Sequence, residues 1–242
     1  ERKDIKNLLK DEKRRNKVIS REITEIGKRF GPDTEFGRRR TQIGAAPVSA
    51  PLPLEAMIER QPVTVLCSQK GWIRAVKGHI DGDAAKYKEG DRAKFHLPAQ
   101  TTDKLLIFAT NGRFYTIGCD KLPGGRGDGE PLRLMIELGN GHDVLAMFVY
   151  RPGRRLLVAS ETGRGFIVDE DETLAQTRNG KQVLNIAAGE EAAACVPVEE
   201  GADHVAALGR AGKLLIFPLA EVPVMARGRG VILQRYRQGG LA

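Results

Sequence analysis

The chain has 242 residues, 41% of them hydrophobic, and a formal net charge of +8, which suits one large globular domain with an appendage. No apolar run approaches the roughly 18 residues of a membrane-spanning helix, and no signal peptide opens the chain, so neither a membrane protein nor a secreted one is expected. The three cysteines, Cys67, Cys119 and Cys195, stand far apart in apolar surroundings. This pattern predicts buried free thiols in a reducing cytoplasm rather than disulfides.

Residues 1–30 are predicted to form one amphipathic helix. Their apolar side chains recur with helical spacing, with a polar interval at Glu12 and Arg15, and Gly31-Pro32 ends the pattern because proline cannot continue a helix. An exposed apolar stripe needs a partner, so we expect this helix to be the end of a preceding domain. An ordinary solvated terminal helix is the alternative.

Residues 31–62 have the composition of a linker. They include the basic run Arg38-Arg39-Arg40 and a proline-rich piece, and residues 52–60 could form a short helix. The arginine run could contact nucleic acid, although such runs are more often solvated surfaces.

From residue 63 onward, a β-hairpin with a glycine turn recurs four times. In the clearest copy, Asn111-Gly112 separates two apolar runs, which is the strongest short-range signal for a hairpin. The turn glycines Gly71, Gly112, Gly163 and Gly212 are 41, 51 and 49 residues apart. A period of this size predicts a propeller-like array, so we predict an all-β fold of about four blades. The predicted blade ranges are 63–103, 104–150, 151–200 and 201–242, and no closing element follows the last, which suggests an open arc or further blades.

A basic, glycine-rich loop begins 13 to 15 residues after each turn glycine. The four loops contain Lys86–Gly90, Gly125–Gly127, Arg178–Lys181 and Arg227–Gly230. After the second loop, the alternation of Leu132, Leu134 and Ile136 with Arg133 and Met135 predicts a further strand.

The charge is unevenly distributed along the chain. Residues 1–43 hold 14 Lys/Arg against 8 Asp/Glu, and the other residues hold 25 against 23. The cations of the repeats gather on the glycine-rich loops, whereas acids concentrate at 169–172 and 190–203. We therefore expect one basic edge with acidic surfaces elsewhere, the layout that suits a phosphate backbone.

Catalytic and metal-binding patterns are weak. The four histidines His79, His96, His142 and His204 lie in different repeats without further ligands at metal-binding spacing. Residues 209–213 lack the Ser or Thr and the length of a phosphate-binding P-loop. The acidic run at 169–172 fits a solvated turn at a strand end better than a cation site. The sequence therefore does not predict an enzyme.

The basic loops remain as the candidate site. Glycine allows backbone N–H groups to approach phosphate, and the neighbouring Arg and Lys add charge. Such contacts position a duplex without reading its bases. Aromatic residues make up only 5% of the chain, which argues against stacking on single strands, so an arc of loops would bend a duplex. The alternative is that the loops are tight connections whose arginines keep the surface soluble.

Several segments resemble one family closely. Val63–His79 resembles the first blade of the C-terminal domain in the ParC-type subunit of bacterial topoisomerase IV. Further similar segments are Tyr87–Asp91, Arg126–Leu132, Gly163–Phe166 and Gly212–Pro218, and the resemblance covers nearly the whole chain.

The resemblance implies a β-pinwheel, a propeller relative in which neighbouring blades exchange a strand. It implies that the domain binds and bends double-stranded DNA and sets the preference of the enzyme among supercoiled and linked substrates. The implied DNA-contacting residues are Lys86, Lys88, Arg92, Arg126, Arg178, Lys181, Arg227 and Arg229.

The family's catalytic tyrosine belongs to a domain before Glu1, and its ATPase is a separate polypeptide, so the resemblance implies no catalysis and no cofactor in this chain. ATP and Mg²⁺ would act through other domains. Implied partners are double-stranded DNA, the ATPase subunit of topoisomerase IV, and a second copy of the ParC-type polypeptide, in the bacterial cytoplasm at the nucleoid.

Three alternatives stay open. The corresponding domain of gyrase has a Gln-Arg-Arg-Gly-Gly-Lys-Gly box for tight wrapping, to which Gly124–Gly127 and Arg227–Gly230 are incomplete matches. A propeller could instead serve as a platform for protein partners, with an exposed apolar patch. The helix at residues 1–30 could also make the chain chiefly an aid to dimerisation.

Overall fold

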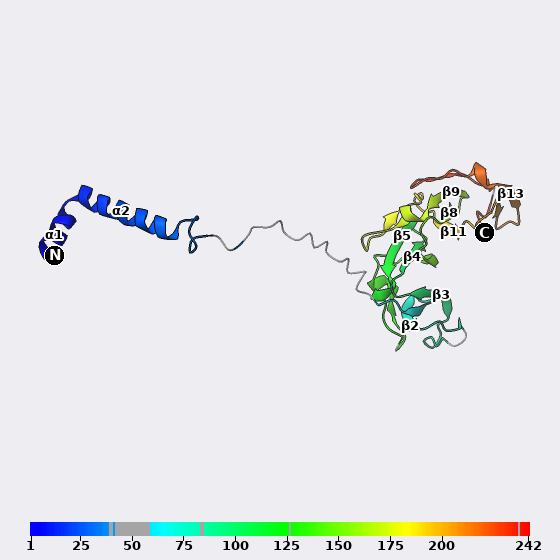
Figure 1. Cartoon of the computed structure of the whole chain (residues 1–242). Coiled ribbons are helices and arrows are strands. Elements are labelled where there is room, and N and C mark those ends of the chain that lie inside the picture. Colours follow the sequence, from blue (N-terminus) through cyan, green and yellow to red (C-terminus); the bar gives the residue numbers. More distant parts are fainter. Residues whose placement is uncertain (39–40, 42–58, 83–84, 126, 237) are drawn as a thin grey trace. The chain divides into compact units, whose positions relative to one another are not determined.

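The structure, a computed structural model, describes residues 1–38, 41, 59–82, 85–125, 127–236 and 238–242 (Figure 1). The chain divides into two compact units, Glu1–Pro51 and Leu52–Ala242. Arg39, Arg40, Arg126 and most of the short helix expected at 52–60 lie outside the described residues.

The first unit contains two helices where one was predicted, α1 (Arg2–Lys10) and α2 (Glu12–Phe30). The break falls at Asp11, whose backbone is extended and whose carboxylate accepts a hydrogen bond from the Arg14 N–H at 3.2 Å. Asp11 therefore caps the N-terminus of α2. Asp is preferred at this cap position and is less favoured in the interior of a helix. Neither helix buries a residue within its own unit, and neither is long and apolar enough to cross a membrane.

The second unit is built from four antiparallel hairpins, as predicted. The hairpins are β1 (Pro62–Ser68) with β2 (Trp72–Lys77), β4 (Lys104–Ala109) with β5 (Arg113–Gly118), β8 (Arg155–Ser160) with β9 (Arg164–Asp169), and β12 (His204–Leu208) with β13 (Leu214–Pro218). In the first three sheets a further strand pairs with the first hairpin strand: β3 (Ala93–Gln100), β7 (Val144–Val149) and β11 (Ala192–Pro197). The all-β prediction is confirmed.

Each of these three sheets is completed by a two-residue strand from the following repeat. The strand β6 (Glu130–Pro131) pairs with β2, β10 (Lys181–Gln182) pairs with β5, and β14 (Val231–Ile232) pairs with β9. Each sheet thus draws on two repeats, which is the strand exchange of a pinwheel. The fourth sheet has only β12 and β13 within the described residues.

A glycine immediately precedes each exchanged strand. These residues, Gly129, Gly180 and Gly230, have φ values of +87°, +69° and +70°, which favour glycine. A Cβ atom would lie 2.3 Å, 2.6 Å and 2.2 Å, respectively, from a backbone oxygen of the preceding sheet. Glycine is therefore needed at these positions for close packing of the loop against the sheet edge.

The strand predicted at 132–136 is wrong. The residues after β6 form a 3₁₀ turn, η4 (Leu132–Leu134), in which the Leu132 carbonyl accepts from the N–H groups of Met135 and Ile136. Leu132 and Ile136 are buried, whereas Leu134 is exposed. Burial four residues apart is helical spacing, which the short alternation of apolar residues did not reveal.

The core consists of three clusters, each between successive sheets. On β4, Leu105 and Ile107 pack in the cluster shared with the first sheet, and Phe108 packs in the cluster shared with the third. The ring centroids of Phe108 and Phe114 are 4.6 Å apart. Because side chains alternate across a strand, a sheet covered on both sides reads as a continuous apolar run.

The three cysteines are free and buried, as predicted, and burial raises the pKa of the Cys67 and Cys119 thiols to about 12 and that of Cys195 well above its usual value. Only the thiolate reacts with disulfide reagents. We expect no thiol of the folded protein to react with Ellman's reagent at pH 8 within minutes, and all three to react in denaturant. Rapid release of chromophore by the native protein would contradict this packing.

Gly180→Ala should destabilise the protein more than Gly153→Ala. Both glycines have positive φ, +69° and +73°, but only Gly180 lies against the preceding sheet, whereas a Cβ on Gly153 meets nothing within 4 Å. Both variants carry the cost of the left-handed backbone, and overpacking adds about 1–3 kcal/mol at Gly180. Urea unfolding of the two variants measures the difference, and equal losses would show that the close approach carries no cost.

Candidate nucleic-acid interface

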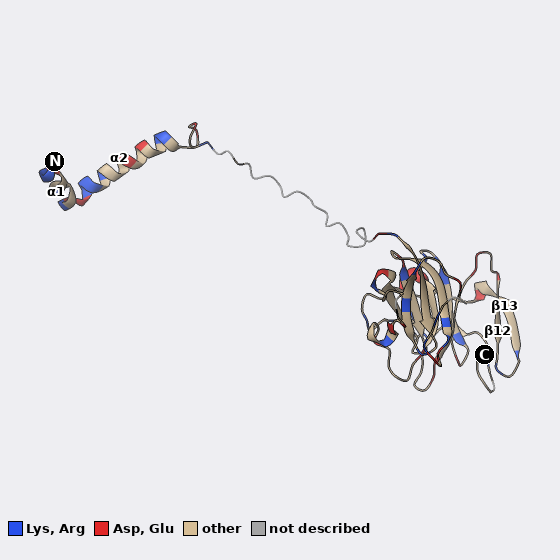
Figure 2. Ribbon diagram, turned by 90° about the horizontal axis from the view of Figure 1, so that it is seen from below, with Lys and Arg blue, Asp and Glu red and all other residues tan. Residues whose placement is uncertain are grey.

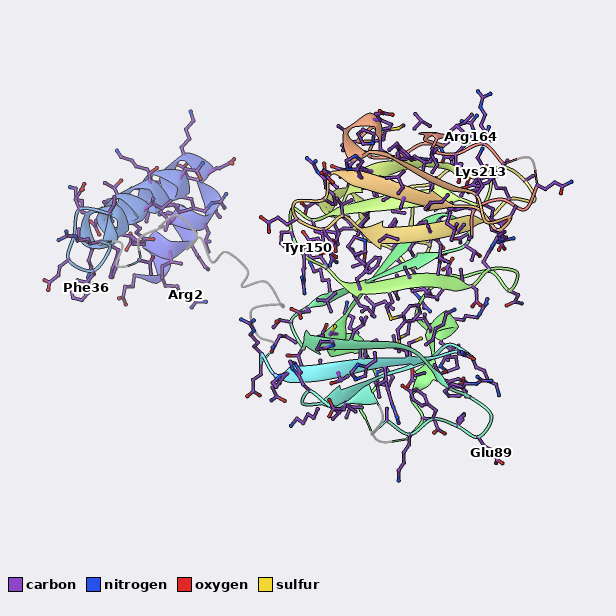
Figure 3. All side chains as sticks on the ribbon, turned by 90° about the vertical axis from the view of Figure 1, so that its right-hand side faces the viewer. Arg2, Phe36, Glu89, Tyr150, Arg164 and Lys213 are labelled. Atoms are coloured by element: carbon purple, nitrogen blue, oxygen red, sulfur yellow. The ribbon has the colours of Figure 1, made fainter. Side chains whose placement is uncertain are left out.

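Three of the four basic loops lie at corresponding places in the pinwheel. The described residues of all four loops, 86–90, 124–125, 127–129, 178–182 and 227–230, are together called the loop track. The second, third and fourth loops lead into β6, β10 and β14, which pair with the first residues of β2, β5 and β9, beside the hairpin turns. Figure 3 shows Glu89, Arg164 and Lys213 toward one side of the pinwheel and Tyr150 toward the other.

Arg74 joins the first two loops of the track. Its side chain lies on β2 and is nearly buried, with 9% exposed, and its guanidinium donates hydrogen bonds to the carbonyls of Lys86 and Gly127. A buried guanidinium needs such acceptors, because an unpaired charge would be costly. Arg74 therefore orders the track without facing solvent.

Arg178 joins the second repeat to the third. Its guanidinium donates to the carbonyls of Leu134 and, at 3.0 Å, Met135, at the end of η4. The Arg178 carbonyl accepts from the Glu137 N–H at 2.9 Å. Part of this predicted DNA-contacting side chain thus holds the end of η4 in place.

The fourth loop lies against the segment that follows β10. The Gly228 N–H donates to the Val183 carbonyl at 3.0 Å, and the Gly228 carbonyl accepts from the Asn185 N–H at 2.7 Å. Hydrogen bonds therefore join the first loop to the second through Arg74, and they join the third and fourth loops to the segments that follow β6 and β10.

The residue after the turn glycine anchors the third and fourth loops. Arg113 donates to the Asn179 carbonyl at 2.9 Å, and Arg164 donates to the Gly230 carbonyl at 3.4 Å. Sequence reasoning did not assign these arginines. The repeated Gly-Arg pair, at Gly112-Arg113 and Gly163-Arg164, was the signal that could have found them.

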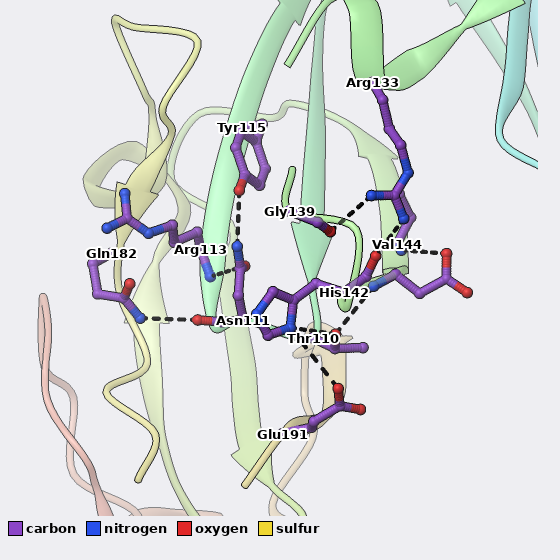
Figure 4. A network of polar contacts seen from close by, with 11 residues as sticks. Thr110, Asn111, Arg113, Tyr115, Arg133, Gly139, His142, Val144, Gln182 and Glu191 are labelled. Carbon is purple, nitrogen blue, oxygen red and sulfur yellow. Dashed lines mark hydrogen bonds and ion pairs between the residues drawn. The ribbon is translucent and has the colours of Figure 1, made fainter. Parts of the chain in front are cut away.

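The turn of the second hairpin is held by a polar network (Figure 4). The Asn111 amide donates to the Tyr115 hydroxyl at 2.9 Å, and the Gln182 amide donates to the Asn111 carbonyl at 3.1 Å. Gln182 belongs to the exchanged strand β10, so the turn is fastened to a residue of the next repeat.

His142 and His96 have structural contacts. His142 Nδ1 lies 3.8 Å from the Glu191 carboxylate, and the His142 carbonyl accepts from Arg133 at 2.6 Å (Figure 4). His96 Nε2 lies 2.8 Å from the Ile80 carbonyl. Within the described residues, no three His, Cys, Asp or Glu side chains are grouped so as to hold a metal ion.

The predicted contact residues of the first loop differ in their surroundings. Lys86 and Arg92 are exposed. The Lys88 ammonium lies 3.3 Å from the centroid of the Trp72 ring and 3.9 Å from an oxygen of Asp128. A cation over the face of an indole is attracted by the ring electrons, so the position of Lys88 is defined by two partners.

Two predicted contact residues of the third and fourth loops already have partners within the protein. Lys181 pairs with Glu172 at 3.5 Å, and the Nε of Arg227 donates to the Asn185 side-chain oxygen at 3.4 Å. Arg227 and Arg229 are exposed. The site prediction for Arg126 falls on a residue outside the described ranges.

Glu190 shows how near the acids come to the track. Burial works to raise the pKa of this carboxyl, but hydrogen bonds from Thr162, the Ala187 N–H and Ser160, together with the Arg229 charge, hold the pKa below its usual value. Glu190 is therefore an anion whose carboxylate is fixed by hydrogen bonds, and the charge of Arg229 in the fourth loop favours its ionised form.

The expectation that acids lie on other surfaces is wrong for Asp128 and Glu172, each of which forms an ion pair with a track lysine. The acidic run at 169–172 is a turn at a strand end, as predicted, and Asp171 and Glu172 are exposed, but Glu170 is not solvated. The run leads into η5 (Glu170–Thr173), where Glu170 is fully buried, forms an ion pair with Arg154 and accepts from the Arg151 N–H at 3.0 Å. Tertiary contacts decide the place of these acids, and the sequence does not show those contacts. Figure 2 shows Lys, Arg, Asp and Glu distributed along the ribbon.

Comparisons with known proteins agree with this architecture. The family described as DNA gyrase C-terminal domain, beta-propeller, matches residues 154–199 and 203–241. The A-type subunit of DNA topoisomerase 4 from Caulobacter vibrioides is 52% identical over 204 residues, which cover 84% of this chain and 26% of that protein. The chain thus spans about a quarter of the length of that relative, and 32% of the length of the Rickettsia bellii one.

Solved structures place the fold in the same group. The C-terminal domain of Escherichia coli ParC superposes with a TM-score of 0.70 at 32% identity, over 75% of this chain and 78% of that one. A DNA gyrase A C-terminal domain superposes with a TM-score of 0.53 at 18% identity, over 75% and 63% of the two chains, which shows the fold alone. The chain belongs to the family of ParC-type topoisomerase IV C-terminal domains.

Proposed function

We propose that this chain is the non-catalytic, DNA-binding and DNA-bending part of a bacterial topoisomerase IV, within its ParC-type polypeptide. The observation that carries the proposal is the loop track, in which glycine-rich loops held by hydrogen bonds beside the hairpin turns present exposed lysines and arginines. Exposed cations in a row neutralise successive phosphates of a duplex, whatever its sequence.

Bending follows from the same geometry. Because the loops belong to successive blades, a duplex that contacts all of them must follow their arrangement and deform. Such a domain would select DNA crossings for the enzyme and so set the preference for decatenation and supercoil relaxation. Cleavage, ATP and Mg²⁺ would belong to other domains and to the separate ATPase polypeptide, in an enzyme with two ParC-type chains at the bacterial nucleoid.

Loss of one track cation should weaken duplex binding by about the same factor whatever the DNA sequence. Arg227→Ala should weaken binding to any duplex and lower the slope of log affinity against log salt by about 0.9, because one phosphate contact is lost. Fluorescence anisotropy with labelled duplexes over a salt series measures both quantities.

Arg155→Ala is the matched control, since Arg155 is exposed, pairs with Asp169 and lies at the start of β8, away from the turn. It removes the same charge without removing a track contact. Equal effects of the two variants would show that only net charge matters and that the track is not the contact surface.

Affinity should rise with duplex length until the track is filled, and then level off. A short duplex engages only some of the loops, so it releases fewer counterions than one that spans them all. End-labelled duplexes of increasing length, titrated at one salt concentration, report both affinity and the end-to-end shortening that bending causes. Affinity independent of length would contradict binding along the track.

A platform for protein partners is the second candidate function, and one observation favours it. The β12–β13 hairpin exposes Leu208, Leu214, Leu215 and Ile216 by 39–59%. Adjacent exposed apolar side chains are typical of interaction surfaces. Such binding would depend little on salt, whereas DNA binding would weaken steeply as salt rises.

A further inference from the structure

Two half-exposed ion pairs involve lysines of the loop track. The Lys88 ammonium lies 3.9 Å from Asp128, with 40% and 48% of the side chains exposed. Lys181 lies 3.5 Å from Glu172, with 41% and 56% exposed. Both lysines are among the side chains that the proposed function assigns to phosphate, yet each already has an anion beside it.

Carboxylate and phosphate oxygens compete for the same ammonium protons. Both accept charge-assisted hydrogen bonds, and an ion pair that water reaches is weak. A duplex phosphate could therefore replace either carboxylate. Until it does, the carboxylate neutralises the lysine, and after it does, the displaced carboxylate repels the phosphate.

The indole ring makes the first pair the sharper case. Trp72 lies on β2 and holds the Lys88 ammonium over its face at 3.3 Å. If Asp128 lost its charge, Lys88 would keep this support and stay at the track. Removal of the Asp128 charge should therefore free the cation without displacing it.

Glu190 does not belong with these two acids. Its carboxylate accepts from Ser160 at 2.8 Å, from the Ala187 N–H at 3.0 Å and from Thr162. It fastens the loop before β11 to the turn of the third hairpin. Its replacement would disturb structure as well as charge, so it cannot report on DNA binding alone.

We propose that Asp128 and Glu172 limit the affinity of the loop track for DNA, by acting as built-in phosphate competitors at Lys88 and Lys181. This inference rests on the proposed function and adds to it. The track holds a duplex less tightly than its cation content allows, and this suits a domain that must release DNA segments.

Asp128→Asn should bind duplex DNA about three- to tenfold more tightly at low salt and steepen the salt dependence by up to about one unit, since an unpaired lysine gains a phosphate. Glu172→Gln should behave in the same way at a second loop, so misfolding of one variant leaves the other. Anisotropy titrations with one duplex over a salt series measure both effects.

Glu200→Gln is the control with the same change of net charge. Glu200 is exposed in the connection between β11 and β12, and no described Lys or Arg forms an ion pair with it. It should raise affinity only slightly and leave the salt slope unchanged. If Asp128→Asn and Glu172→Gln gain no more than this control, the inference is wrong.

A double variant links the gain to the lysine. In a Lys88→Ala background, Asp128→Asn should gain no more than Glu200→Gln does, because no cation is left to free. A full gain without Lys88 would overturn the inference. Absence of salt-dependent duplex binding by the unaltered protein would instead refute the proposed function itself, so the two failures are distinguishable.

Discussion

The hydrogen-bonding edge of each sheet is the constraint on which this fold depends. A blade made only of its own repeat would leave the N–H and C=O groups of β2, β5 and β9 unpaired along one side. Unpaired backbone groups are costly when they are buried, and an exposed edge strand tends to pair with another chain. The next repeat supplies two residues to each edge. The loop that delivers those residues must then pass close to the sheet, which only glycine permits. The array of blades and the position of the basic loops are therefore one consequence of edge pairing.

Sequence reasoning predicted those features that local chemistry decides. The Asn111-Gly112 turn and its three counterparts follow from backbone preferences, and their spacing was enough for a propeller-like array. The two-residue strands could not be predicted from the sequence pattern, because a strand of that length has no periodicity of its own. Residues 132–136 were misjudged for the same reason: burial of Leu132 and Ile136 is set by the preceding sheet. Likewise, the break at Asp11 depends on a single capping side chain within a long apolar pattern.

The candidate site shows a similar division. Lys88, Lys181 and Arg229 could be selected from their loops, since basic residues near glycines at a repeated offset are visible in the chain itself. Their anionic neighbours could not, because Asp128 is brought to Lys88 from another repeat. The anchoring role of Arg74 was hidden too, since its acceptors at positions 86 and 127 are remote in sequence. The glycines of the basic loops were selected because glycine lets the backbone approach phosphate. The structure gives a second reason for them, which is close packing of the loop against the sheet edge.

Trp72 is the only tryptophan in the chain, and it lies half-buried beneath the Lys88 ammonium. Indole emission responds to a charge placed against the ring, and here one charged group is in contact with the only indole. Light emitted by this protein after excitation at tryptophan wavelengths therefore comes from the first blade alone. The intrinsic spectrum is thus a local optical probe of this one corner, with no dye attached.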